Sequence, residues 1–264
     1  MQWQENGGMS RKRGKVYLVG AGPGAADLLT VRAVRILNRA EIVFHDALIH
    51  PDVLTHCPPA CVIVPVGTRG GFRVPNRQQH IHERLAEAVA QYTTVVRLKG
   101  GDPCVFGRGG EELEFLAEQG IAWEVVPGIS AGVGGLSLLG LPVTHRDLAA
   151  SVMLLTGSRT ASGALEELPL SGPLSPSQTF VFYMPFRHFD EIAKQLMSHG
   201  LPASTPAMCV SSLSYPHQAT VSSPLADLGN AVAEANLTPP TLLIVGDVVG
   251  WWQRLQAGIE RDER

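Results

Sequence analysis

The sequence predicts an α/β protein with two α/β domains, and three observations carry this prediction. Short apolar runs that suit buried strands alternate with segments whose apolar residues recur at helical spacing. Glycine-rich turns directly follow two of these runs, at residues 20–25 and 100–110, as they do in βαβ units. A chain of 264 residues is also long enough for two cores. We place an N-terminal α/β domain at residues 15–127 and a C-terminal one at residues 128–258, and we expect the ligand in the cleft between them.

The composition is that of a globular protein, with 45% hydrophobic and 17% charged residues. A net charge of −3 excludes a generic nucleic-acid-binding protein, which would be strongly basic. No apolar run reaches the length that crosses a bilayer, and residues 1–14 lack the apolar core of a secretion signal. We therefore predict a flexible tail at residues 1–14, no membrane contact and a location in the cytoplasm.

The four cysteines show no spacing typical of a disulfide framework. Cys57 and Cys61 lie next to His56 in the sequence, but no second pair of ligands follows them. Because structural zinc sites need a complete set of four ligands, we predict no metal site. Unpaired cysteines also agree with a reducing cytoplasm.

The N-terminal domain begins with a strand at residues 16–19, the glycine turn and a helix at residues 29–40 that Thr30 can cap. Further strands are expected at residues 41–44, 62–66, 95–98 and 123–126, and further helices at residues 81–89 and 111–120. The turn at residues 20–25, with Asp46 further along, is similar to a dinucleotide-binding fingerprint. Pro23 removes an amide from that turn, so the match is imperfect. A dinucleotide-dependent oxidoreductase remains an alternative function.

The segment at residues 95–112 is the one around which we expect the site to form. Its strand runs into a loop with glycines, whose backbone can approach a ligand closely. This loop lies at the carboxyl end of a strand, where open α/β sheets bind ligands. Glu111 and Glu112 suit the positive end of the following helix. An ordinary solvated turn with a charged rim is the alternative interpretation.

The C-terminal domain is expected to hold a second sheet, which we predict to be mixed. A helix of small residues is expected to open at residues 129–135, and the Pro/Gly/Ser-rich residues 158–178 are expected to form a loop or a short helix. The other expected elements are strands at residues 152–157, 179–184, 206–210 and 241–246 and a helix at residues 189–199.

Several motifs, in order along the chain, resemble those of the tetrapyrrole methylases. They are Gly20-Ala21-Gly22-Pro23-Gly24, Asp46, residues 96–103, residues 106–109, Val126-Pro127-Gly128, residues 142–146 and Phe182-Tyr183-Met184. The likeness covers about residues 15–249 and is greatest to those members that methylate uroporphyrinogen III with S-adenosylmethionine. It implies a homodimer with two α/β domains. It also implies methyl transfer to C2 and C7 of uroporphyrinogen III, through precorrin-1 to precorrin-2, for sirohaem, cobalamin or haem d1.

The resemblance also implies which residues form the site. The S-adenosylmethionine set is Pro23, Gly100, Gly101, Asp102, Val105, Ser130, Ala131, Met184, Leu213 and Thr241. The tetrapyrrole set, which we take as catalytic, is Asp46, Arg108, Glu111 and Arg146.

The residue types in the tetrapyrrole set suit this chemistry. The methyl donor is an electrophilic sulfonium, so the enzyme mainly aligns the reactants and excludes water. A carboxylate such as Asp46 can stabilise the positive charge that develops on a pyrrole ring, or accept its proton. The guanidinium groups of Arg108 and Arg146 match the carboxylates of the substrate. Alternatively, Arg108 pairs only with Glu111 or Glu112, and Asp46 merely caps a turn.

Thr68 departs from the family pattern, in which a lysine usually occupies this position and serves as a proton donor. A threonine hydroxyl is neither a cation nor a comparable acid at neutral pH. The alternatives that stay open are a methylase of a later corrin precursor and a tetrapyrrole-binding protein without turnover.

Overall fold

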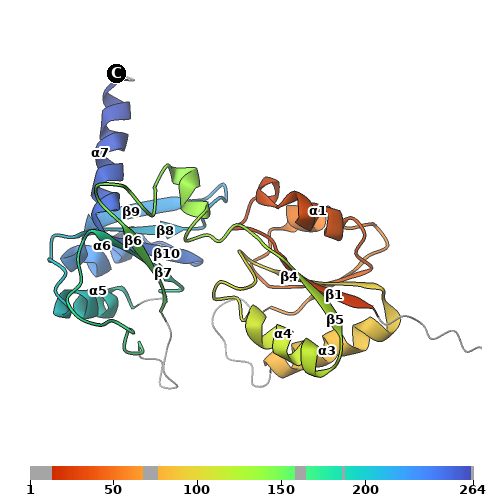
Figure 1. Cartoon of the computed structure of the whole chain (residues 1–264). Helices are drawn as coiled ribbons and strands as arrows, with labels where there is room; N and C mark the ends of the chain where they lie inside the picture. The colour runs from red at the N-terminus through yellow and green to blue at the C-terminus, as the bar shows by residue number, and fades with distance from the viewer. Residues whose placement is uncertain (1–13, 68–76, 158–164, 186–187, 263–264) are drawn as a thin grey trace, which may run out of the picture. The chain divides into compact units, whose positions relative to one another are not determined.

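The computed structural model describes residues 14–67, 77–157, 165–185 and 188–262. Residues 1–13 of the predicted tail, and Thr68, lie outside these ranges. The chain forms two compact units (Figure 1). The first unit holds the chain up to Ala21 and from Leu29 to Gly128, and the second holds Gly22–Leu28 and the chain from Ile129 onward. The turn after the first strand therefore divides between the two units.

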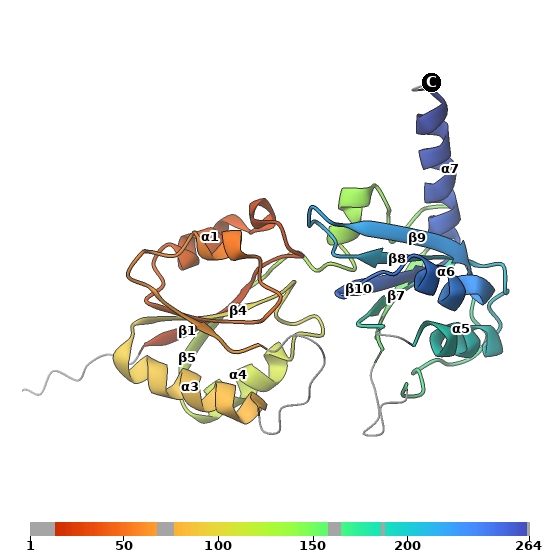
Figure 2. The same ribbon diagram turned by 180° about the vertical axis from the view of Figure 1, so that it is seen from behind.

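The sheet of the first unit is parallel throughout, with the strand order β3-β2-β4-β1-β5. Its strands are β1 (Lys15–Gly20), β2 (Ile42–His45), β3 (Val62–Pro65), β4 (Thr94–Lys99) and β5 (Ala122–Val126). Its helices are α1 (Val31–Leu37), the short α2 (Pro51–Leu54), α3 (Arg77–Gln91) and α4 (Gly109–Glu118). Figures 1 and 2 show α1 on one face of the sheet and α3 and α4 on the other. The five strands and three longer helices predicted for this part of the chain are confirmed.

Local sequence accounts for the ends of these helices and for the faces of the strands. Thr30 caps α1, and its hydroxyl oxygen accepts a hydrogen bond from the amide of Ala33 at 3.1 Å. Gly120 has a φ of 61°, the left-handed conformation that commonly follows a helix end. Val16 and Leu18 alternate along β1 and pack in the core that also contains residues of α3 and α4.

The junction between β1 and β4 is where the helical connections change face. The chain leaves β1 through α1 on one face of the sheet, and leaves β4 through α4 on the opposite face (Figure 2). Open α/β sheets bind ligands outside the carboxyl ends of the strands at such a switch point. β1 ends at Gly20, and the turn after β4 begins at Gly100.

The second unit contains a mixed sheet, as predicted, and its strand order is β6-β7-β10-β8-β9. Its strands are β6 (Ser151–Thr156), β7 (Gln178–Tyr183), β8 (Pro206–Ser211), β9 (Ala219–Pro224) and β10 (Thr241–Val245). Only the β6–β7 pair is parallel among the pairs of this sheet that the structure describes. The helices are α5 (Phe189–Ser198), α6 (Leu228–Glu234) and α7 (Asp247–Asp262), with short 3-10 turns at Ala26–Leu28, Gly135–Leu139 and Leu225–Asp227. The sequence did not predict β9, α6 or α7.

Alternating side chains of the central strands divide the core of this unit into two layers. Phe180 and Phe182 of β7 pack with residues of α5 and α6, whereas Val181 packs with Val248 and Val249 of α7. Both faces of the sheet are therefore covered, which explains why β7 is apolar at successive positions rather than alternating.

The small-residue helix that was expected to open at residues 129–135 is a 3-10 helix, Gly135–Leu139, which begins at the last of these residues. Gly132 and Gly134 have low helix propensity. The amide of Gly132 donates to the side-chain hydroxyl of Tyr183 at 2.9 Å, and the amides of Val133 and Gly135 donate to the carbonyl oxygen of Ser130, so a tertiary contact and local turns together hold this segment.

Candidate active site

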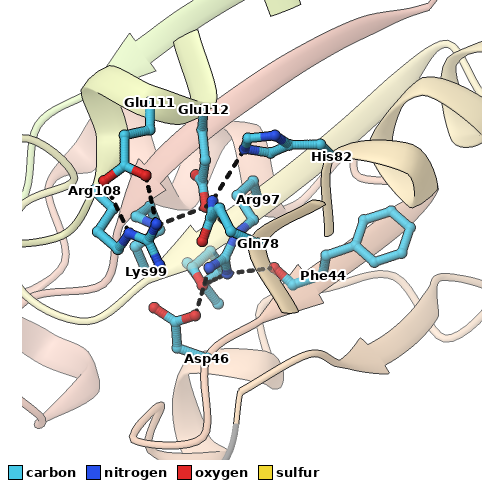
Figure 3. Close-up of polar contacts among 10 residues, drawn as sticks. Phe44, Asp46, Gln78, His82, Arg97, Lys99, Arg108, Glu111 and Glu112 are labelled. Atoms are coloured by element: carbon cyan, nitrogen blue, oxygen red, sulfur yellow. Dashed lines mark hydrogen bonds and ion pairs between the residues drawn. The ribbon is translucent and has the colours of Figure 1, made fainter. Parts of the chain in front are cut away.

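Asp46 lies directly after β2, at the carboxyl edge of the first sheet, and its side chain is 29% exposed. Its Oδ1 atom accepts a hydrogen bond from Nη2 of Arg97 on the neighbouring strand β4, at 2.5 Å (Figure 3). Arg97 also donates from Nη1 to the carbonyl oxygens of Leu98 at 3.1 Å and Phe44 at 3.5 Å. The carboxylate of Asp46 is therefore held by a guanidinium and does not simply cap a turn.

A buried carboxylate, Glu112 of α4, lies on the other side of Arg97. Its Oε1 atom accepts hydrogen bonds from Arg97 Nε at 3.1 Å, Lys99 Nζ at 2.9 Å and Gln78 Nε2 at 3.2 Å (Figure 3). Glu112 is fully buried, and Arg97 and Lys99 are each 2% exposed. We call Asp46, Gln78, Arg97, Lys99 and Glu112 the buried charge cluster.

The two cations of this cluster respond differently to burial. Burial acts to lower the pKa of Arg97, but the carboxylates of Asp46 and Glu112 outweigh it, so this pKa lies above its ordinary value. The pKa of Lys99 is lowered, first by burial and then by the adjacent Arg97 charge, against the attraction of Glu112. Arg97 is thus the permanent cation that faces Asp46.

Three glycines bring three turns of the first unit into backbone contact. A Cβ atom placed on Gly20 would lie 2.6 Å from the carbonyl oxygen of Gly101 and 2.6 Å from Cα of Gly128. One placed on Gly128 would lie 2.2 Å from that same oxygen. Gly101 itself has a φ of 66°. Larger residues are excluded from this arrangement, so the backbone is left close to whatever binds at the edge of the sheet.

The side chain of Asp102 anchors the loop after β4 through two hydrogen bonds. Its Oδ1 atom accepts from the amide of Cys104 at 2.8 Å, and its Oδ2 atom accepts from the amide of Gly128 at 3.1 Å. Gly100 has open space where a Cβ would be, and Val105 is partly buried. The structure thus brings together Gly100, Gly101, Asp102 and Val105, the four predicted donor-site residues of this loop.

Arg108 and Glu111 form an exposed ion pair at the start of α4. Arg108 Nε donates to Glu111 Oε1 at 2.9 Å, and Nη2 donates to Oε2 at 2.5 Å. The hydrogen bond from Arg108 lowers the pKa of Glu111. Both side chains are about half exposed, at 53% and 51%, where such a pair adds little stability. Arg108 also has a φ of 58°, a costly conformation for arginine that fixes where its side chain starts.

Three of the predicted residues of the second unit gather around Gly135. A Cβ atom placed on Gly135 would lie 2.8 Å from Leu213 Cδ2, 3.5 Å from Pro23 Cβ and 3.6 Å from the carbonyl oxygen of Ser130. Pro23 belongs to this unit with the segment Gly22–Leu28, and Ala25 donates its amide to Ser214 Oγ at 3.0 Å. Pro23, Ser130 and Leu213 are therefore neighbours although they are far apart in the sequence.

Tyr183 joins two more predicted positions to this group. The Tyr183 hydroxyl lies 2.6 Å from Oγ of Ser130, the residue before Ala131. Tyr183 is followed in the chain by Met184, which has a φ of 50° and is 43% exposed. Thr241 opens β10 opposite Ser211, two residues before Leu213. Arg146 is exposed in the turn that the His145–Ala149 bridge closes.

The sequence interpretation missed Tyr183 and most of the buried charge cluster as functional residues. One signal was present, since Arg97 and Lys99 interrupt the apolar strand at alternate positions and so face the same side as Val95. Among the described residues there is no group of three or more metal-ligating side chains. No helix in the described part of the chain is long and apolar enough to cross a membrane.

Comparison with known proteins shows which sequences this chain is similar to. The model of the Tetrapyrrole (Corrin/Porphyrin) Methylases matches residues 15–229. The chain is 44% identical over 236 residues to the S-adenosyl-L-methionine-dependent uroporphyrinogen III methyltransferase, chloroplastic, of Arabidopsis thaliana, covering 89% of this chain and 64% of that protein. It is 43% identical to a siroheme synthase of Pseudomonas fluorescens, covering 95% of this chain and 53% of that protein. The chain therefore spans between half and two thirds of these curated relatives.

A solved structure gives the same result for the fold. The crystal structure of uroporphyrin-III-C-methyltransferase from Thermus thermophilus superposes with a TM-score of 0.76 at 41% identity, covering 92% of this chain and 96% of that chain. Together with the family match over most of the sequence, this shows that the chain belongs to the tetrapyrrole (corrin/porphyrin) methylase family.

Proposed function

We propose that this protein transfers methyl groups from S-adenosylmethionine to C2 and C7 of uroporphyrinogen III, passing through precorrin-1 to precorrin-2. The observation that carries the proposal is the 44% identity, over 89% of this chain, to a relative named as an S-adenosyl-L-methionine-dependent uroporphyrinogen III methyltransferase. The Thermus thermophilus enzyme of the same kind has nearly all of its length covered, so the likeness includes both units.

The methyl donor would be held mainly by backbone. Adenosylmethionine supplies an electrophilic methyl group. In the first unit, Gly100, Gly101, Asp102 and Val105 offer it the loop that follows β4. Close backbone packing at Gly20, Gly101 and Gly128 keeps side chains out of the contact between these three turns, which fits a ligand bound along the backbone. In the second unit, the donor set is Pro23, Ser130, Ala131, Met184, Leu213 and Thr241.

The tetrapyrrole would be held by side-chain charge. Arg108 is exposed and already pairs with a carboxylate, Glu111, in the geometry that a propionate of the substrate would use. Arg146 offers a second exposed guanidinium. Asp46, fixed by Arg97, presents the anionic group that stabilises the charged pyrrole or takes up its proton. The expected position of the site between the two domains stays a prediction.

An assay with S-adenosylmethionine carrying a labelled methyl group tests the activity. The protein is incubated anaerobically with uroporphyrinogen III, and in parallel with later corrin precursors. We expect two labels in the product from uroporphyrinogen III, identified as precorrin-2 by its mass and absorption. Label found only on a later precursor would favour the other methylase function. Binding of NAD, together with no heat signal from S-adenosylhomocysteine, would favour the oxidoreductase instead.

We also propose that the chain works as a homodimer in the cytoplasm. Leu138 and Leu255 of the second unit are 50% and 44% exposed, which supplies apolar surface for an interface. All four cysteines are free, in agreement with a reducing compartment. Sedimentation equilibrium tests the dimer, for which we expect twice the chain mass of 28.2 kDa.

A further inference from the structure

Glu112 has a role in the fold that its position at the start of a helix does not explain. A glutamate in the first turn normally stays in water, where it interacts with the helix dipole. Glu112 is instead fully buried, and three donors converge on its Oε1 atom. Its Oε2 atom is also buried and has no hydrogen-bond partner among the described residues. Burying a carboxylate in this way is costly, so a structural role alone is better filled by an apolar residue.

The contacts of Glu112 lead directly to Asp46. Arg97 donates from Nε to Glu112 and from the neighbouring Nη2 of the same guanidinium to Asp46 (Figure 3). The group is planar and rigid, so an anchor at Nε sets the direction in which Nη2 points. The bond to Asp46 Oδ1 is the shorter of the two, at 2.5 Å against 3.1 Å.

Glu112 also balances the positive charges of Arg97 and Lys99. Arg97 and Lys99 lie side by side in a nearly water-free environment, and Glu112 is the carboxylate that contacts both. If that charge is removed, the two cations repel each other and compete for Asp46, which Arg97 alone contacts in the intact cluster. The carboxylate of Asp46 would then lose its single orientation.

We propose that Glu112 is a positioning residue for methyl transfer: it orients Arg97 and, through Arg97, the carboxylate of Asp46. Glu112 itself touches neither substrate. This inference rests on the proposed function, because it assigns Asp46 to the reacting centre. It predicts a loss of turnover rather than a loss of donor binding, since misorientation of a reacting group acts on the chemical step.

The main variant is Glu112→Gln. The amide oxygen can still accept from Arg97 and Lys99, and the amide nitrogen takes the place of the oxygen that has no partner, so size and shape are kept while the charge is lost and that one atom becomes a donor. We expect kcat to fall between about tenfold and 100-fold and the Kd of S-adenosylhomocysteine to stay within about threefold. Glu114→Gln is the matched control, because it removes an exposed glutamate from the same helix, and it should behave as wild type.

A double-mutant cycle with Asp46→Asn separates positioning from general stability. If Glu112 acts through Asp46, the Glu112→Gln change adds less than about twofold in the Asp46→Asn background, measured in single turnovers. A full additional loss there, or wild-type kcat in the single variant, would overturn the inference. If Glu112→Gln does not fold, Arg97→Lys tests the same inference. We expect it to lose turnover, because one ammonium cannot replace a guanidinium that bridges two carboxylates. Wild-type turnover with Arg97→Lys would equally overturn it.

A crystal structure of Glu112→Gln makes the test independent of the proposed function. We expect Arg97 Nη2 to leave hydrogen-bond distance of Asp46 Oδ1. An unchanged contact would refute the positioning role even in an active enzyme. Conversely, a wild-type protein that does not methylate uroporphyrinogen III, while this contact is lost in the variant, would refute the assigned reaction and leave the positioning of Asp46 supported.

Discussion

The hydroxyl of Tyr183, at the end of β7, lies 2.6 Å from Oγ of Ser130 and accepts the amide hydrogen of Gly132 at 2.9 Å. A Cβ atom on Gly132 would lie 2.6 Å from this ring, so the segment packs directly against it. A single side chain thereby holds the segment that contains two predicted donor-site residues, Ser130 and Ala131.

Removing that hydroxyl should weaken donor binding. We expect Tyr183→Phe to raise the Kd of S-adenosylhomocysteine about three- to tenfold, since one net hydrogen bond is worth about 0.5–1.5 kcal/mol. Isothermal titration calorimetry measures this, with Tyr92→Phe as the control. A Tyr183→Phe variant that binds as tightly as wild type would show that the segment does not depend on this contact.

The exposed arginines should discriminate between the two ligands. We expect Arg108→Ala and Arg146→Ala each to raise the KM for uroporphyrinogen III at least tenfold, because a hydrogen bond to a charged group contributes about 1.5–3 kcal/mol. Binding of S-adenosylhomocysteine should change little. Arg35→Ala, on the exposed side of α1, is the control. Equal losses for both ligands would contradict the assignment of these residues to the tetrapyrrole.

Close packing of the glycine turns makes a sharp prediction for Gly128→Ala. Its Cβ would lie 2.2 Å from the carbonyl oxygen of Gly101, so the loop after β4 must shift. Overpacking of this kind costs about 1–3 kcal/mol, and thermal unfolding should show a lower Tm together with weaker donor binding. Gly110→Ala is the matched control, because nothing lies within 4 Å of its Cβ position and it lies in α4. Wild-type donor affinity in Gly128→Ala would mean that this packing does not shape the donor site.

Cysteine reactivity offers a test that needs no substrate. Burial raises the pKa of both Cys57 and Cys209 to about 12, with the neighbouring Cys61 adding to the effect at Cys57. Because the thiolate is the reactive form, both should resist iodoacetamide at pH 7.5 and react faster only as the pH rises. Exposed Cys104 should be modified first, as followed by peptide mass spectrometry.

The same experiment reports on the donor site. Cys104 lies between two predicted donor-site residues, Asp102 and Val105, so S-adenosylhomocysteine should slow its modification. The Cys104→Ser variant should lose the fast-reacting label. Modification of Cys57 as fast as that of Cys104, or no protection by the ligand, would argue against these assignments.

Local sequence was enough to predict the strands and longer helices of the first unit and the glycine turns after β1 and β4. Thr30 at a helix start and glycines after β1 and β4 act within a few residues of their own position, so their effect can be predicted without a structure. The order of motifs along the chain was likewise sufficient to indicate the family. Short or weakly patterned elements such as β9 gave no such signal.

Only the tertiary structure decided which side chains meet. Arg97 and Asp46 are 51 residues apart, and Tyr183 and Ser130 are 53 apart, so the first pair depends on the order of strands in a sheet and the second on how a loop packs against a strand end. Periodicity reveals which face a residue occupies but not which strand or helix faces it. For this reason Glu112 looked like a solvated residue at a helix start, and residues 129–135 looked helical. The residues that bury Glu112, and the tyrosine that packs against residues 130–132, come from other elements of the chain.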